Sequence, residues 1–344
     1  MNKKQIIKLI TFPILLVGCI FSLEFFLFRK VSDDLTSYSQ FYKENEDCLD
    51  VVLIGNSTLR EGYVPTTIWK EEGIMSRGLS SSPTHPEVIK VAIKEVINKQ
   101  HPEVIFIDVN GLTFQKREYS QRFIEQYYKA LPKGEHKDEL LKMYPYLVKD
   151  EDKFELFPNH NNFRQQQYWE SLVYPDQFKT KGYQPNKITK AISPVAIPSN
   201  KLPLNDDGEY YFNELVSECE KYQDKVTFVF GKMPKVNDVS GKDAFIESEA
   251  MFNTIEERLK DTNIKYKNFT RYINDIGLDS NKDFKDEDHL NHLGALKFTR
   301  YFAKYLKEEL KINIKEKSKA SITSFNDCYD RTKDYLESIE NKLK

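Results

Sequence analysis

Two short polar stretches near opposite ends of the chain carry side chains that could act together as a catalytic triad. Ser57 directly follows an apolar run and lies close to Gly55, so its hydroxyl can be presented at the end of a buried strand with little steric obstruction. Far along the chain, Asp286 precedes His289 by three positions at the start of a helical pattern. The carboxylate can accept the Nδ1 proton of the imidazole, which leaves Nε2 free to act as a general base. These residues predict nucleophilic attack by an activated serine.

Both stretches also have simpler interpretations. Gly-Asn-Ser at 55–57 is an ordinary turn sequence. His292 can be read as a polar residue in the first turn of the following helix. A metal site could be imitated by neighbouring side chains, namely Asp286, Asp288, His289 and His292. No further pair with ligand spacing is visible, however, so the sequence predicts neither a metal ion nor a cofactor.

The elements expected to position these residues alternate between strand and helix. Unbroken apolar runs rich in β-branched and aromatic residues are typical of strands buried on both faces, and they occur at 51–54, 104–107, 226–230 and 264–266. Helical patterns at 87–97 and 249–259 lie between them. The sequence therefore predicts a three-layer α/β/α sandwich with a mostly parallel sheet, spanning about residues 49–312.

A long interval at 118–205 interrupts this alternation. It is rich in aromatic residues and proline, and it falls between two predicted strands. We expect an insertion over the carboxyl edge of the sheet, which is where open α/β sheets bind ligands. Its aromatic side chains could stack on sugar rings, although aromatic residues more often fill a core.

The amino-terminal segment predicts a membrane anchor at 1–30. Residues 9–28 are apolar apart from Glu24 and match the thickness of a bilayer core. Lysines precede this run, so we expect a cytoplasmic amino terminus and an extracytoplasmic domain. A cleaved signal peptide would need a small-residue cleavage site, which is absent after Phe28. Lipidation at Cys19 is the other alternative, but apolar sequence continues well beyond this cysteine.

The amino-acid composition excludes several other classes of protein. The 344 residues include 51 Lys+Arg and 53 Asp+Glu, so no basic field exists to hold a nucleic acid. A mean hydropathy of -0.61 excludes a multi-span membrane protein. The four cysteines show no spacing typical of a disulfide framework or a zinc site. Residues 31–48 are expected to be a polar connector, and 313–344 a charged carboxyl-terminal helix.

The two polar stretches resemble the sequence blocks of a known superfamily. Gly55-Asn56-Ser57 resembles the Gly-Asp-Ser nucleophile block of the SGNH/GDSL hydrolases, with Asn56 in place of the usual aspartate. Asp286-x-x-His289 resembles their closing block and stands in the same order along the chain. The resemblance implies an SGNH-hydrolase-like fold, with Ser57 as nucleophile, His289 as base and Asp286 as the group that orients the base. It also implies oxyanion donors, matched here by the Ser57 N–H, Gly78 and Asn110.

The anchor and the insertion narrow the resemblance to a cell-envelope branch that includes teichoic-acid D-alanyl-transfer proteins and other partners of membrane-bound O-acyltransferases. The insertion is loosely similar to theirs through His160, Arg164 and Trp169, which implies substrate binding there. The expected function is that of a membrane-anchored serine acyltransferase or esterase. It would move an acetyl, D-alanyl or similar acyl group on a cell-surface polysaccharide or teichoic acid.

Two alternatives to this function remain open. The first is a plain carbohydrate esterase that removes acetyl groups. The second is a non-catalytic scaffold that binds a polymer or an acyltransferase subunit, which Asn56 and the loose match at Asn110 keep possible. Retention of the serine, the aspartate and the histidine together argues against the scaffold.

Overall fold

A parallel sheet forms the centre of the molecule, as the apolar runs predict. The computed structural model describes residues 3–27, 33–80, 86–113, 121–147 and 180–344. The five strands are β1 (Val51–Gly55), β2 (Ser76–Ser80), β3 (Val104–Asp108), β4 (Thr227–Lys232) and β5 (Lys265–Asn268). They pair in the order β2-β1-β3-β4-β5, and every pairing is parallel. The predicted α/β fold class is confirmed.

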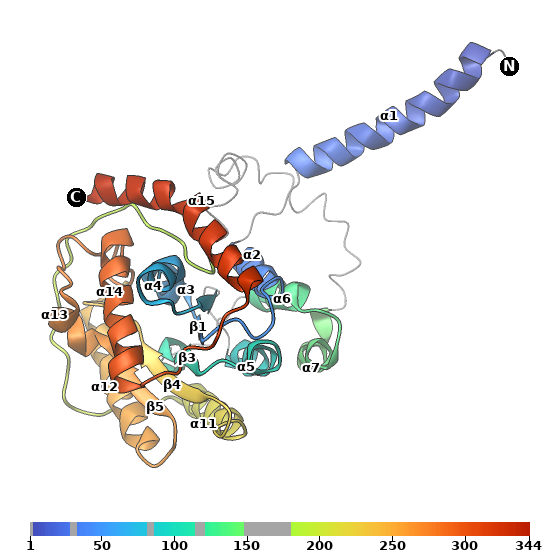
Figure 1. Cartoon of the computed structure of the whole chain (residues 1–344). Helices are drawn as coiled ribbons and strands as arrows, with labels where there is room; N and C mark the ends of the chain where they lie inside the picture. The colour runs from blue at the N-terminus through green and yellow to red at the C-terminus, as the bar shows by residue number, and fades with distance from the viewer. Residues whose placement is uncertain (1–2, 28–32, 81–85, 114–120, 148–179) are drawn as a thin grey trace.

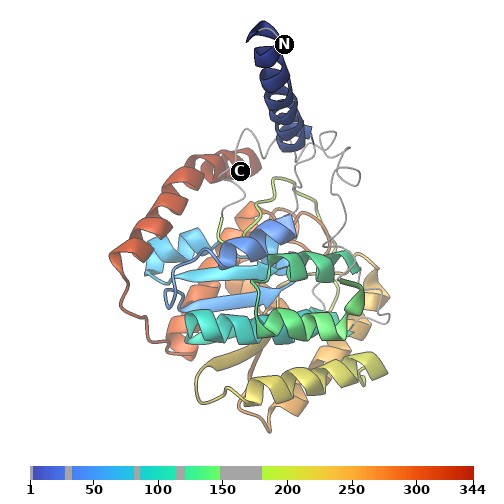
Figure 2. The same cartoon turned by 90° about the vertical axis from the view of Figure 1, so that its right-hand side faces the viewer.

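Helices cover both faces of this sheet (Figures 1 and 2). The helices of the sheet domain are α2 (Asp33–Phe41), α3 (Ser57–Gly62), α4 (Pro65–Glu72), α5 (Pro86–Gln100), α6 (Gln121–Ala130), α7 (Glu135–Met143), α11 (Asp206–Glu220), α12 (Lys242–Leu259), α13 (Ile273–Ile276) and α14 (His292–Lys304). A π-helical turn at Tyr305–Glu309 follows α14, and the long α15 (Lys319–Leu343) ends the chain.

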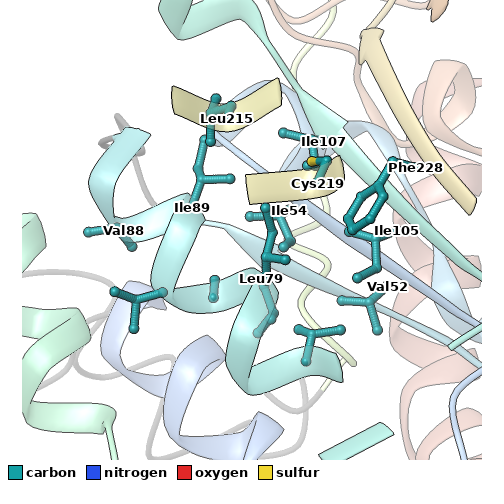
Figure 3. Close-up of a cluster of buried hydrophobic side chains, with 14 of the residues drawn as sticks. Val52, Ile54, Leu79, Val88, Ile89, Ile105, Ile107, Leu215, Cys219 and Phe228 are labelled. Atoms are coloured by element: carbon teal, nitrogen blue, oxygen red, sulfur yellow. The ribbon is translucent and has the colours of Figure 1, made fainter. Parts of the chain in front are cut away.

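Alternate residues of each strand serve two separate cores, because successive strand side chains point to opposite faces. Val52, Ile54 and Ile105 pack against α5 and α11, together with the other side chains shown in Figure 3. Leu53 and Phe106 belong to the opposite core, which includes apolar side chains of α3, α4 and α14. Two cores with one shared sheet are the three-layer arrangement that the sequence predicts.

The edge strand β2 was not among the predicted apolar runs. Its sequence, Ser-Arg-Gly-Leu-Ser, is mostly polar, yet all five residues are buried. Helix α2 lies against it and buries Tyr38 and Phe41 in the domain core. The folded unit therefore includes α2, which lies within the 31–48 segment expected to be a polar connector.

The amino-terminal helix α1 (Lys3–Leu27) is long and apolar enough to cross a membrane between Lys4 and Ser22. The side chains of this stretch are not buried inside the structure. This is the arrangement expected of a membrane-spanning helix or a signal anchor.

The described part of the 118–205 insertion has two components. Helix α6 contacts α2, and α7 contacts α5, so both lie on the flank of the domain. The irregular stretch at 180–192 instead reaches the carboxyl edge of the sheet, where the backbone N–H of Gln184 donates to the carbonyl of Arg60 in α3. Only this second component occupies the position expected for the insertion.

Candidate active site

Ser57, His289 and Asp286 meet at the carboxyl edge of the sheet. Ser57 is the first residue of α3, directly after β1, and its Oγ lies 2.8 Å from His289 Nε2 across 232 positions of sequence. The other ring nitrogen, Nδ1, lies 2.8 Å from Asp286 Oδ1. A hydroxyl, an imidazole and a carboxylate thus form one chain of hydrogen bonds, which is the arrangement that lets a serine act as a nucleophile.

The strand order explains why the site forms here. The connection from β1 to β2 runs through α3 and α4 on one face, whereas the connection from β3 to β4 includes α11 on the other. Strand order 2-1-3-4-5 therefore has its topological switch point between β1 and β3, and open α/β sheets bind ligands at that point. Ser57 follows β1, and Asn110 follows β3.

Asp286 is held as a carboxylate. Its Oδ1 accepts hydrogen bonds from the backbone N–H of Asp288 at 3.0 Å and of His289 at 2.9 Å, besides the ring. Partial burial alone would raise the pKa of Asp286, but these hydrogen bonds and the charge of the ring lower it to about 2. An ionised acceptor keeps the proton on Nδ1 and turns the lone pair of Nε2 toward Ser57.

Ion pairs fix the loop that carries Asp286 and His289. Lys285 reaches across to Glu61 at the end of α3, with Nζ 3.0 Å from Oε2. The largely buried Lys235 bridges Asp238 at 2.6 Å and Asp288 at 3.2 Å, which ties the loop after β4 to the same segment. These contacts attach the base and its carboxylate to the elements that carry the nucleophile.

Asn56 and Thr58 hold the turn that presents the serine. The side-chain oxygen of Asn56 caps α3 by accepting the Thr58 N–H at 2.9 Å, so Asn56 has a structural role. The Thr58 hydroxyl lies 2.6 Å from that oxygen and 3.0 Å from Asp108 Oδ2 at the end of β3. Burial raises the pKa of Asp108. The hydrogen bonds that its carboxylate accepts from the Asn110 N–H and from Thr58 act in the opposite direction.

Asp108 is a residue that sequence reasoning missed. It connects the nucleophile turn to β3 through Thr58, and it also accepts the backbone N–H of Asn110 at 2.9 Å. The sequence feature that could have indicated its role is the single carboxylate that ends the apolar run at 104–107, in Ile-Phe-Ile-Asp. Nothing in that run indicates that its partner is Thr58.

The structure does not support Gly78 as an oxyanion donor. Gly78 lies in the middle of β2, and its N–H already donates to the carbonyl of Lys181 at 3.0 Å, so the prediction that it stabilises an oxyanion is wrong. Gly78 is instead in close backbone contact with Gly182, which has a φ of +90°; a Cβ there would lie 2.1 Å from the Gly78 carbonyl oxygen. This tight approach leaves no room for a substrate oxygen.

Asn110 and the Ser57 N–H remain candidates for oxyanion stabilisation. Asn110 begins a short 3-10 helix after β3 and is 6% exposed. Within the described part of the chain its side-chain amide makes no hydrogen bond. The Ser57 N–H has no acceptor within α3 because the first N–H groups of a helix lack intrahelical partners. The three predicted substrate-binding residues, His160, Arg164 and Trp169, lie outside the described residues.

His292 begins α14, as its position predicted, but it is buried and serves packing instead of the triad. The ring is 1% exposed, and its Nδ1 lies 2.7 Å from the hydroxyl of Tyr183. Burial lowers the pKa of His292 to about 4. The hydrogen bond between the neutral ring and the Tyr183 hydroxyl ties the 180–192 stretch to the start of α14.

This buried histidine predicts an acid-sensitive fold. Between pH 4 and 6.5 the unfolded chain binds a proton at His292 that the folded chain does not, so the free energy of unfolding falls by about 3 kcal/mol as the pH drops through this range. We expect His292→Asn to remove this part of the pH dependence while it retains an acceptor for Tyr183. Urea unfolding at pH 7 and pH 4.5 measures it; equal pH dependence in both proteins would assign the acid sensitivity to other groups.

Two solved structures resemble this chain. A putative acylhydrolase from Bacteroides fragilis NCTC 9343 shares 13% identity, with 82% of this chain and 100% of that chain covered and a TM-score of 0.41. A GDSL-like lipase from Bacteroides thetaiotaomicron VPI-5482 shares 15% identity, with 80% and 99% covered and a TM-score of 0.40. No protein-family model matches the chain, and no curated protein matches it in sequence. The function is therefore argued from the geometry of the site.

Proposed function

We propose that this protein is an SGNH-type serine esterase or O-acyltransferase. The observation that supports the proposal is the continuous chain of hydrogen bonds from Ser57 through His289 to Asp286, with 2.8 Å at each step. Its position at the switch point of the sheet gives a substrate access to the nucleophile. The order of the sequence blocks, with the serine first and the aspartate and histidine last, also resembles the SGNH/GDSL hydrolases.

The geometry supports acyl transfer in two steps. Ser57 Oγ attacks the carbonyl carbon of an ester while His289 Nε2 takes the hydroxyl proton, and Asp286 stabilises the imidazolium that results. His289 then donates this proton to the departing alkoxide as the ester bond breaks, leaving an acyl-Ser57 intermediate. Water or an acceptor alcohol next attacks the acyl carbon and gives its proton to His289. As the bond between the acyl carbon and Ser57 Oγ breaks, His289 returns this proton to Oγ and free Ser57 is restored. Donors beside Ser57 would stabilise the negative oxygen in both steps.

The proposal extends to location and substrate. Helix α1 is suited to anchor the chain in a membrane, and the lysines that precede it favour an extracytoplasmic domain. We therefore place the catalytic domain at the cell envelope, acting on a cell-surface polysaccharide or teichoic acid. The resemblance to partners of membrane-bound O-acyltransferases suggests such an enzyme as the donor of the acyl group.

A plain carbohydrate esterase is the second candidate, because the same triad hydrolyses an ester when water is the acceptor. The two functions separate when an activated acyl ester is supplied with and without an alcohol. Free acid as the sole product in both reactions identifies the hydrolase, whereas an acylated alcohol identifies the transferase.

Labelling with a fluorophosphonate probe tests the nucleophile. Ser57 Oγ should attack the phosphorus and form a stable adduct, so we expect the full chain in detergent to be labelled and Ser57→Ala to remain unlabelled. Ser338→Ala, which changes an exposed serine of α15, is the matched control and should label like the parent. Equal labelling of the Ser57→Ala protein and the parent would exclude Ser57 as nucleophile, whereas absence of labelling in both would favour the non-catalytic scaffold.

A further inference from the structure

A cavity whose lining includes none of the triad residues is formed by residues of α2 and the turn after it, the edge strand β2, Lys181 and α15. Its volume is about 710 Å³, which is large enough for a small organic ligand. Six charged side chains line it: Lys43, Glu44, Arg77, Lys181, Asp327 and Arg331. The proposed acyl chemistry uses none of them.

The inner wall of the cavity contains two buried cations and one carboxylate. Arg77 Nη1 and Lys181 Nζ both contact the carboxylate of Glu44, the latter at 2.7 Å and 3.0 Å. The side chains of Arg77, Lys181 and Glu44 are 1%, 7% and 6% exposed. One carboxylate cannot neutralise two cations, so an excess positive charge remains where little water screens it.

Arg77 also retains an unused donor. Its Nη2 donates to the carbonyl of Ser37 at 2.9 Å, but its Nε is buried and has no hydrogen-bond partner among the residues that the structure describes. A buried cationic donor without an acceptor is unfavourable, so an anion beside it would stabilise the folded state. The guanidinium group has the planar geometry that binds phosphate and carboxylate oxygens.

The outer part of the cavity adds to the positive charge. Lys43 and Arg331 are exposed, and Asp327 opposes them. Four cations and two carboxylates leave a net charge of +2 on the lining. The other lining residues are mostly hydroxyl and amide side chains, namely Gln40, Asn45, Thr323, Ser324 and Thr332. Such a lining offers hydrogen-bond partners to a polar, hydroxylated ligand.

We propose that this cavity binds a phosphate group carried on a polar, hydroxylated molecule. A phosphate monoester carries nearly two negative charges at pH 7, which matches the net charge of the lining. A phosphate occurs as a monoester in free sugar phosphates and as a singly charged diester in anionic phospholipid headgroups such as that of phosphatidylglycerol. The proposal is independent of the reaction at Ser57 and adds a second ligand site to the protein.

Calorimetric titration of the full chain in phosphatidylcholine nanodiscs tests the site. Glucose 1-phosphate is the probe, and glucose, which lacks the phosphate, is the uncharged control ligand. We expect saturable binding of glucose 1-phosphate that weakens with added salt. The double variant Lys43→Gln/Arg331→Gln removes exposed charges of the cavity and should weaken binding about tenfold or more. Lys260→Gln/Lys265→Gln removes two exposed charges elsewhere and should bind like the parent.

Two further experiments distinguish a lipid phosphate from a soluble one, and this proposal from the proposed reaction at Ser57. Nanodiscs rich in phosphatidylglycerol should displace glucose 1-phosphate if the ligand is a lipid headgroup, and should leave its affinity unchanged if the ligand is soluble. Ser57→Ala should bind glucose 1-phosphate normally, so either proposal can fail alone. No binding to any phosphate probe, equal binding of glucose, or equal affinity in the two double variants would overturn the assignment.

Discussion

His289→Ala is expected to lower the turnover of an activated acyl ester by about 10⁶-fold, because loss of the base in comparable triads costs about as much as loss of the whole triad. Without the imidazole, nothing in the hydrogen-bonded chain can take the proton from Ser57 Oγ, which lies 2.8 Å from His289 Nε2. The measurement is kcat/KM for a p-nitrophenyl ester at pH 7, with the folded state checked by circular dichroism.

His292→Asn is the matched control for this variant. It changes a histidine three positions along the chain, whose ring contacts Tyr183 and not Ser57. We expect it to retain near-parental turnover at pH 7. A loss of less than about tenfold in His289→Ala would place the general base elsewhere.

Asp286→Ala should lower the same turnover by about 10⁴-fold, since the imidazole loses both its orientation and the charge that stabilises its protonated form. Asp286→Asn should cost less than Asp286→Ala. One oxygen, Oδ1, receives the ring Nδ1–H and both backbone N–H groups, and an amide oxygen in that position still favours the correct tautomer. The loss in Asp286→Asn then reports mainly the missing negative charge.

Glu287→Gln is the control for the aspartate variants. It neutralises the adjacent carboxylate, which pairs with Lys190 on the exposed side of the loop at 2.6 Å. Its turnover should stay within a few-fold of the parent. If Asp286→Asn and Asp286→Ala lost activity equally, the carboxylate would act through its charge alone and not by holding the ring.

The parts of the fold that could be predicted are those that depend on the order of apolar and polar residues within a short stretch of sequence. The runs at 51–54 and 104–107 are apolar on both faces, so their burial within a parallel sheet follows from composition. Asp286 and His289 are three positions apart, and local geometry alone brings their side chains together. The position of Ser57 followed from its place at the end of a strand, but its contact with His289 requires the whole sheet.

The parts that could not be predicted depend on distant partners. Strand β2 contains Arg77, whose buried guanidinium pairs with Glu44 from the turn that follows α2. Gly78 resembled an oxyanion donor because its sequence context matched, but Lys181, 103 positions away, takes its N–H. A single sequence carries no local signal of such long-range pairs, which form when the 180–192 stretch folds back onto the sheet.

The packing of α2 into the domain limits how far the folded domain can lie from α1. Only residues 28–32 separate Leu27, the end of α1, from Asp33, the start of α2, and a fully extended connection of this length spans at most about 20 Å. With α1 in a bilayer, the folded domain is confined to a thin zone at the membrane surface. Under the proposed function, a long polymer would be acylated or deacylated only along the portion that comes within this zone, so distance from the membrane would itself select the sites of reaction.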